Sequence, residues 1–326
     1  MSEHQGLNAS PSEWPKALFY TALLFSTYQI ITAAFHPVSS QVLRAGHVGF
    51  LLLMVFLCYP ARGTGRPWQP LAWLLGLAGM ATFAYQWVFE GDLIQRSGDL
   101  TTLDMIIGIG LTLLIFEAAR RVMGIALPLI CGLFLLYGLF GEYLPGDLAH
   151  RGYGFDQIIN QLAFGTEGFY GTPTYVSATY IFLFILFGAF LEQAGMIKLF
   201  TDFAMGLFGH KLGGPAKVSV ASSALMGTIT GSGVANVVTT GQFTIPLMKR
   251  FGYRPAFAGA VEATSSMGSQ IMPPVMGAVA FIMAETINVP YVEVAKAALI
   301  PALLYFGSVF WICLLYTSPS PRDQRG

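Results

Sequence analysis

Six long apolar runs constrain this chain more than any other feature of its sequence. They are bounded by charged residues, prolines or glycines and cover roughly residues 17–35, 46–60, 70–89, 103–119, 124–144 and 176–195. A helix needs about 20 apolar residues to cross the hydrocarbon core of a bilayer. Together with a last run at 294–316, they predict an all-α polytopic membrane protein.

Composition agrees with a place in the bilayer. Hydrophobic residues make up 54% of the 326 residues and charged residues only 10%, whereas soluble domains carry about 25% charged residues. The 17 basic and 17 acidic side chains leave no basic excess for nucleic-acid binding. Three cysteines stand alone in apolar stretches and predict neither a metal site nor a disulfide framework: Cys58, Cys131 and Cys313.

The distribution of basic residues predicts a cytoplasmic N-terminus under the positive-inside rule. In this orientation the inner side receives Lys16, Arg62, Arg66, Arg120, Arg121, Lys198, Lys211 and Lys217. The outer side receives only Arg44, Arg96 and Arg151. No small-residue cleavage site follows the first apolar run, so we interpret it as a retained membrane helix.

Two amphipathic segments are expected beside the spans. Residues 145–175 are too polar to cross, but apolar side chains recur there at helical spacing, which predicts an interfacial helix or a connecting arm on the outer side. Residues 197–208 are expected to lie along the cytoplasmic surface.

The stretch 216–248 is apolar yet unusually rich in Gly, Ser and Thr. As one helix it would be about 50 Å long, against a hydrocarbon core of about 30 Å. Gly231 and Gly233 flank Ser232 near its middle and let the backbone leave helical angles. Because basic residues lie at both ends, we predict a re-entrant helical hairpin with its tip near Ser232.

The next stretch, 255–285, is predicted to cross the membrane as an interrupted helix. A polar segment at 265–270 in its middle is followed by Pro273 and Pro274. Consecutive prolines remove two backbone donors and clash with the preceding turn. Both interruptions should face protein or water, because lipid does not tolerate unpaired backbone groups.

A hairpin tip that meets an interrupted helix at mid-membrane is typical of secondary transporters. Half-helix N-termini attract an anion, and carbonyl and hydroxyl oxygens suit a hard cation such as Na⁺. The predicted substrate and ion site comprises Thr230, Gly231, Ser232, Gly233, Asn236, Ser265, Ser266, Gly268, Ser269, Gln270, Pro273 and Pro274. Within it, Na⁺ is assigned to Ser232, Asn236 and Gly268. The alternative for each residue is helix packing, a common role of small and hydroxylated side chains in membranes.

Two isolated titratable side chains need an interpretation. Glu262 is the one acid well inside a predicted span, and an intramembrane acid is a functional candidate by default. Alternatively, it reaches the cytoplasmic interface or pairs with a basic residue such as Arg254. His47 borders the first outer loop and is interpreted as a surface residue.

Two segments of the chain resemble a known family of membrane proteins. They are GTITGSGVANVVTTGQFTIPLMKRFGYRPAFAGAVEATSSMGSQIMPPVMGA at 227–278 and IFLFILFGAFLEQAGM at 181–196. Both are similar to the large membrane subunit of tripartite ATP-independent periplasmic (TRAP) transporters. The resemblance extends over about residues 103–290. It implies a sodium-driven elevator in the bacterial inner membrane that accepts a small organic anion, such as a carboxylate, from a periplasmic solute-binding protein. No cofactor other than the coupling ion is implied.

Three regions follow from the resemblance. Residues 1–100 resemble the small-subunit region of fused, TAXI-type members, and residues 101–316 the first repeat of a DctM-like permease. The family's second, inverted repeat does not follow, so we expect half a site and no transport by the chain alone. The polar residues 317–326 are interpreted as a non-native or truncated tail.

Other classes remain to be distinguished. An elevator-type anion and sodium symporter that works without a binding protein would contain the same helical hairpin and interrupted helix. An intramembrane enzyme is disfavoured, because no HExxH, GxSxG or paired intramembrane acids occur. A channel is also disfavoured, since two unlike breaks in one chain suit a closed carrier site better than a pore.

Overall fold

The computed structural model describes residues 16–59, 69–96 and 98–317, so the predicted tail lies almost wholly outside the described residues. The secondary structure within them is helical throughout. Seven helices are long and apolar enough to cross a membrane: Lys16–Phe35, Ser40–Cys58, Pro70–Val88, Thr102–Met123, Ala126–Tyr143, Thr172–Gln193 and Tyr291–Tyr316. Each overlaps a predicted run, which confirms the all-α membrane class.

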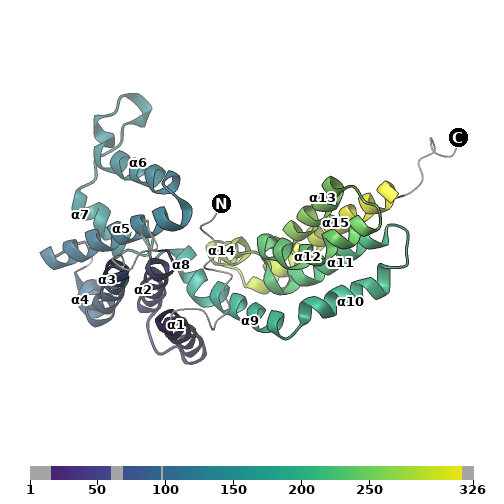
Figure 1. The fold of residues 1–326 in the computed structure, drawn as a ribbon. Coiled ribbons are helices and arrows are strands. Elements are labelled where there is room, and N and C mark those ends of the chain that lie inside the picture. Colours follow the sequence, from purple (N-terminus) through teal and green to yellow (C-terminus); the bar gives the residue numbers. More distant parts are fainter. Residues whose placement is uncertain (1–15, 60–68, 97, 318–326) are drawn as a thin grey trace. The chain divides into compact units, whose positions relative to one another are not determined.

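The chain forms two compact units, residues 1–179 and 180–326, which are described separately. The helices of the first unit are α1 (Lys16–Phe35), α2 (Ser40–Cys58), α3 (Gln69–Val88), α4 (Glu90–Gln95), α5 (Thr102–Met123), α6 (Ala126–Phe140), α7 (Phe155–Ala163) and α8 (Thr172–Val176) (Figure 1). Helix α7 confirms a helix within 145–175. A π-helical turn, Ser177–Ile181, follows α8.

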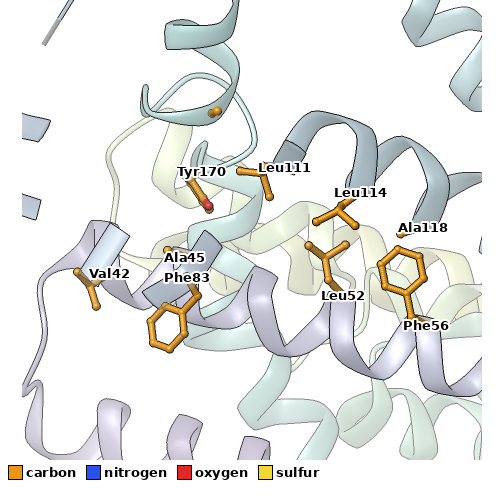
Figure 2. Close-up of a cluster of buried hydrophobic side chains, with 10 residues drawn as sticks. Val42, Ala45, Leu52, Phe56, Phe83, Leu111, Leu114, Ala118 and Tyr170 are labelled. Atoms are coloured by element: carbon orange, nitrogen blue, oxygen red, sulfur yellow. The ribbon is translucent and has the colours of Figure 1, made fainter. Parts of the chain in front are cut away.

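The core of the first unit lies between α2, α3 and α5. Leu52 and Phe56 of α2 face Leu111, Leu114 and Ala118 of α5 across a fully apolar contact (Figure 2). Glycines bring α2 and α3 close: a Cβ at position 79 would lie 2.8 Å from Leu52, closer than real Cβ contacts allow. Small residues at helix interfaces are a usual means of membrane-helix packing.

Helix α2 begins earlier than the sequence predicted, and this corrects the interpretation of His47. The helix starts at Ser40, after Ser39 caps it by accepting a hydrogen bond from the Val42 amide. Arg44, which precedes the run predicted to begin at residue 46, therefore lies inside the helix and donates to the Tyr170 carbonyl at 2.6 Å. His47 is buried and hydrogen-bonds Gln29 and Ser177, so its surface assignment was wrong.

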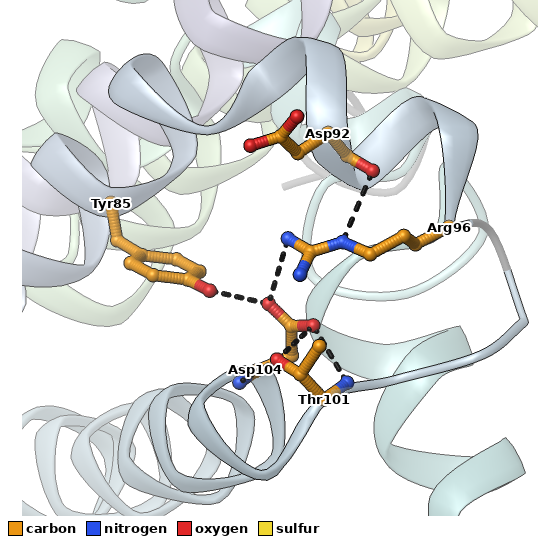
Figure 3. A network of polar contacts seen from close by, with 5 residues as sticks. All are labelled: Tyr85, Asp92, Arg96, Thr101 and Asp104. Atoms are coloured by element: carbon orange, nitrogen blue, oxygen red, sulfur yellow. Dashed lines mark hydrogen bonds and ion pairs between the residues drawn. The ribbon is translucent and has the colours of Figure 1, made fainter.

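A buried carboxylate connects α5 with α3 and α4. Asp104 Oδ2 accepts from the Thr101 amide at 2.8 Å and the Thr101 hydroxyl at 2.6 Å, which caps the start of α5 (Figure 3). Its Oδ1 accepts from the Tyr85 hydroxyl and lies 3.7 Å from Arg96 Nη2. One side chain thus serves a helix cap and a contact between two helices.

Replacing Asp104 by alanine is expected to lower the stability of the chain by about 2–3 kcal/mol, since it removes a cap and leaves the Tyr85 hydroxyl without its acceptor. Thermal unfolding of the detergent-purified chain measures this. Tyr85→Phe, which removes the donor and keeps the cap, should cost about 1 kcal/mol. Equal effects of the two substitutions would contradict the dual role of Asp104.

The helices of the second unit are α9 (Phe182–Gln193), α10 (Met196–Phe208), α11 (Gly214–Thr230), α12 (Gly233–Arg250), α13 (Pro255–Met267), α14 (Ala278–Thr286) and α15 (Tyr291–Thr317). Helix α10 confirms the amphipathic helix predicted at 197–208. Helices α11, α12, α13 and α15 pack together (Figure 1). Their shared core includes Val220, Met248, Val261 and Phe306.

Candidate ion and substrate site

The predicted interruption at 231–233 is a tight turn between two packed helices. Gly231 ends α11 with a left-handed backbone, φ 60°, and its amide donates to the Gly227 carbonyl. Ser232 then caps α12 by accepting a hydrogen bond from the Ala235 amide at 3.3 Å. Glycine adopts positive φ without steric cost, and serine is a favoured cap. The sequence therefore specifies a helical hairpin at this point.

The second predicted interruption separates α13 from α14. Helix α13 ends at Met267, a 3₁₀ turn covers Gly268–Gln270, and α14 begins only at Ala278. The Gly277 amide donates to the Gln270 carbonyl at 2.8 Å, which closes the intervening loop. Pro273 and Pro274 lie within this loop, and the Pro274 carbonyl accepts from the Tyr291 hydroxyl at 2.8 Å.

The hairpin tip and the loop of the interrupted helix touch each other. A Cβ added to Gly231 would overlap the Met276 carbonyl oxygen, so only glycine fits there. A Cβ on Gly227 would lie 2.8 Å from the Ser269 backbone, and one on Gly233 2.6 Å from the Met267 sulfur. The two elements predicted to form a joint site are therefore brought together.

A cavity of about 590 Å³ opens beside this contact. Thr230, Gly231 and Ser232 line it from the tip, and Gln270 and the residues 275–281 line it from the interrupted helix. The C-terminus of α11 and the N-terminus of α14 reach it, because Thr230 and Ala278 line the cavity, and α12 begins directly after its lining cap residue Ser232. No Lys, Arg or His occurs among the described residues that line it.

Asn236 lies just below the tip and joins three segments. Its Nδ2 donates to the Ser223 carbonyl of α11 at 2.8 Å and to the Ser269 hydroxyl of the 3₁₀ turn. The Thr240 hydroxyl lies 3.1 Å from Asn236 Oδ1. Both Asn236 and Ser269 are fully buried. Asn236 and Ser269, both among the predicted residues, thus form a polar contact between the hairpin and the interrupted helix.

Glu262 of α13 is fully buried at the centre of a cluster of hydroxyl groups. Its Oε2 accepts from Ser219 at 2.7 Å and from Thr244, and its Oε1 accepts from Thr240 at 2.5 Å and Ser266 at 3.0 Å. No ion pair to Glu262 occurs within the described part of the chain. The alternative that Glu262 pairs with a basic residue is therefore wrong.

The remaining predicted residues lie at the edge of this site. The Ser265 hydroxyl donates to the Val261 carbonyl of its own helix at 2.7 Å and contacts neither the cavity nor Glu262's carboxylate. Gly268 packs against the rings of Tyr305 and Phe306, and its carbonyl accepts from the Ile271 amide at 3.1 Å. The Thr230 hydroxyl donates to the Met226 carbonyl at 3.2 Å.

Four hydroxyl residues beside Glu262 were not among the predicted site residues: Ser219, Thr240, Thr244 and Ser223, whose hydroxyl lies 3.5 Å from Glu262 Oε1. A signal for them exists in the sequence, because each pair is spaced four residues apart and so lies on one helix face. This spacing indicates a site only once Glu262 is known to face the same sides of α11 and α12.

A helical hairpin that meets an interrupted helix at a cavity lined by helix termini is the arrangement of secondary transporters. The comparison with protein families agrees with this class. The model of the "Tripartite ATP-independent periplasmic transporter, DctM component" matches residues 111–323, more than half of the chain. The chain therefore belongs to this family, which is a family of transporter permeases and not of enzymes.

Three relatives illustrate the similarity. The C4-dicarboxylate TRAP transporter large permease protein DctM of Rhodobacter capsulatus is 34% identical over 103 residues, 32% of this chain and 23% of the relative. The sialic acid TRAP transporter large permease protein SiaM of Vibrio cholerae is 30% identical over 121 residues, 37% of this chain and 28% of the relative.

The third relative, the ectoine TRAP transporter large permease protein TeaC of Halomonas elongata, is 26% identical over 217 residues, 67% of this chain and 45% of the relative. The matched region thus spans less than half of the length of each of these relatives.

Proposed function

We propose that the chain is the permease part of a sodium-coupled TRAP transporter that imports a small organic anion of the carboxylate class. The cavity between the hairpin tip and the interrupted helix carries this proposal. The relatives support it, since two of their names specify a dicarboxylate and sialic acid.

The anion is held by helix N-termini and not by a basic side chain. The N-termini of α12 and α14 reach the cavity, whose described lining has no cationic residue. A helix N-terminus carries about half a positive charge and unpaired N–H groups, which suit a carboxylate. Such a site attracts anions weakly and releases them readily, as a carrier requires.

Na⁺ is bound by oxygen atoms of Ser232, Asn236 and Gly268 in this proposal. Hydroxyl, carboxamide and backbone oxygens are the ligands that hard cations prefer. An ion bound next to the tip favours the arrangement that accepts the anion, so the two bind with positive coupling. No cofactor other than Na⁺ is required.

The proposed partner is a periplasmic solute-binding protein, and the proposed location is the bacterial inner membrane with the N-terminus in the cytoplasm. Residues 1–100 take the place of a small subunit, as in fused TAXI-type transporters. In this orientation both ends of the α11–α12 hairpin face the cytoplasm. Helices α11 and α12 have 17 and 18 residues and are therefore about 26 Å and about 27 Å long, which would place the tip deep in a hydrocarbon core of about 30 Å.

Cysteines introduced at Lys211 and Arg254, on either side of the hairpin, are expected to react with a membrane-impermeant maleimide only from the cytoplasmic side. Native Cys58, Cys131 and Cys313 are replaced first. Labelling is compared in right-side-out and inside-out vesicles. Reaction of the two positions from opposite sides would contradict the re-entrant hairpin.

The function itself is tested by uptake in cells that express the native gene together with the solute-binding protein from the same source organism. Labelled succinate is the probe, and an inward Na⁺ gradient is compared with an equal K⁺ gradient. We expect uptake only with Na⁺ and the binding protein. Equal uptake with K⁺ would overturn sodium coupling, and equal uptake without the binding protein would favour the alternative of an independent symporter.

A further inference from the structure

Glu262 presents a buried negative charge without a cationic side chain beside it. Four hydroxyls of three helices donate to its two oxygens at 3.0 Å or less, from Ser219, Thr240, Thr244 and Ser266, and a fifth, from Ser223, lies 3.5 Å from Oε1. A carboxylate only accepts hydrogen bonds, and four donors fill its acceptor positions. The hydrogen bonds satisfy the oxygens but leave one negative charge uncompensated, and a buried charge normally requires an opposite one.

The orientation of the Asn236 side chain follows from its neighbours. One end of the carboxamide lies 2.8 Å from the Ser223 carbonyl, which can only accept a hydrogen bond. The nitrogen must therefore face Ser223. The carboxamide oxygen consequently points toward Thr240, whose hydroxyl is 3.1 Å away.

The Thr240 hydroxyl has one proton and four acceptors within reach, of which the Ser223 hydroxyl oxygen at 3.4 Å is the farthest. Glu262 Oε1 lies at 2.5 Å, the Asn236 backbone carbonyl at 2.8 Å and Asn236 Oδ1 at 3.1 Å. The shortest contact is also the one to a charged acceptor, and such hydrogen bonds are about twice as strong as neutral ones. The proton therefore goes to Glu262, and Asn236 Oδ1 remains a buried oxygen without a donor.

We propose that Glu262 is a positioning residue for the coupling ion: it holds the Thr240 proton away from Asn236 Oδ1, leaves that oxygen free for Na⁺, and supplies the compensating negative charge. This inference rests on the sodium site of the proposed function and extends it to a residue of α13. The same carboxylate bonds both arms of the hairpin, so ion binding at Asn236 and the packing of α11, α12 and α13 are connected.

Glutamine cannot take this role despite its similar shape. Its amide nitrogen donates, so the hydroxyls that face it must turn round and act as acceptors. The negative charge is lost, and the side chain at position 262 can accept hydrogen bonds from fewer of the surrounding hydroxyls. The Thr240 proton is then free to bond Asn236 Oδ1 and compete with Na⁺.

The test uses the purified full chain in detergent. Thermal unfolding is measured while Na⁺ replaces choline at constant ionic strength, and the Na⁺ concentration that gives half of the stabilisation is compared between variants. Glu262→Gln is expected to raise this concentration at least tenfold. Thr239→Val is the matched control, because the Thr239 hydroxyl bonds only carbonyls of its own helix. The melting temperature in choline reports folding separately.

A second variant keeps the inference testable if Glu262→Gln does not fold. Thr240→Val removes the competing proton and keeps the charge of Glu262, so it should not raise the half-stabilising Na⁺ concentration. A tenfold rise would show that Na⁺ needs the Thr240 hydroxyl itself and would overturn the inference.

The outcomes separate this inference from the function on which it rests. A wild-type response to Na⁺ with an equal response of Glu262→Gln overturns the role of Glu262 and leaves the sodium site standing. A wild-type chain that does not respond to Na⁺ overturns both. A response lost in Glu262→Gln and retained in Thr239→Val and Thr240→Val supports the inference.

Discussion

Replacing Gly231 by alanine in the native gene, expressed with its solute-binding protein, is expected to reduce sodium-dependent uptake at least a hundredfold. The added Cβ would overlap the Met276 carbonyl oxygen, and the residue would have to keep a φ of 60°. A left-handed backbone costs a residue other than glycine about 1–2 kcal/mol. The overlap with backbone adds to this cost and forces the tip away from the loop that carries the other half of the cavity.

Gly252 provides the matched control, because it has a φ of 87° but no atom within 4 Å of the added Cβ. Gly252→Ala should therefore show only the backbone cost, about 1–2 kcal/mol of stability, and retain most of the uptake. Equal losses of uptake in the two variants would contradict the view that contact at the tip, and not backbone conformation alone, is required.

Replacing Asn236 by alanine is expected to raise the Na⁺ concentration for half-maximal uptake at least tenfold and to lower stability by about 2–3 kcal/mol. The substitution removes a proposed ion ligand and both hydrogen bonds of Nδ2, to Ser223 and Ser269. Buried groups that lose their partners cost about 1–3 kcal/mol each. Uptake kinetics at varied Na⁺ and thermal unfolding measure the two effects.

Thr239→Ala is the control for this substitution, since it lies on the same helix and its hydroxyl bonds the Ala235 and Asn236 carbonyls. If Asn236→Ala loses stability but keeps the same Na⁺ concentration for half-maximal uptake, Asn236 is not an ion ligand. Its role is then helix packing, the alternative given for each predicted site residue.

The two interruptions could be predicted because local chemistry determines them. Gly231 permits the positive φ that ends α11, Ser232 caps α12, and Pro273 and Pro274 prevent a continuous helix between α13 and α14. Each effect acts within a few residues of the breaking residue, so it is visible in sequence. The apolar runs likewise predicted the spans, because length and hydropathy alone decide them.

The hydroxyl cluster around Glu262 could not be predicted in the same way. Ser219, Thr240 and Glu262 lie on three helices and meet only because α11, α12 and α13 pack together. The sequence offered an interfacial or a functional acid and could not decide between them. Burial of His47 was missed for a related reason, since its partners Gln29 and Ser177 are distant in sequence.

The central claim is that Na⁺ and an anion bind together at the cavity between the hairpin tip and α14. A cysteine at Ala278, which lines this cavity, tests it most directly in the product of the native gene after Cys58, Cys131 and Cys313 have been replaced. The rate of its reaction with a soluble maleimide is measured with Na⁺ and succinate, with each alone, and with K⁺ and succinate. We predict that only Na⁺ with succinate slows the reaction strongly, by tenfold or more. An equal rate in all four conditions would contradict the claim.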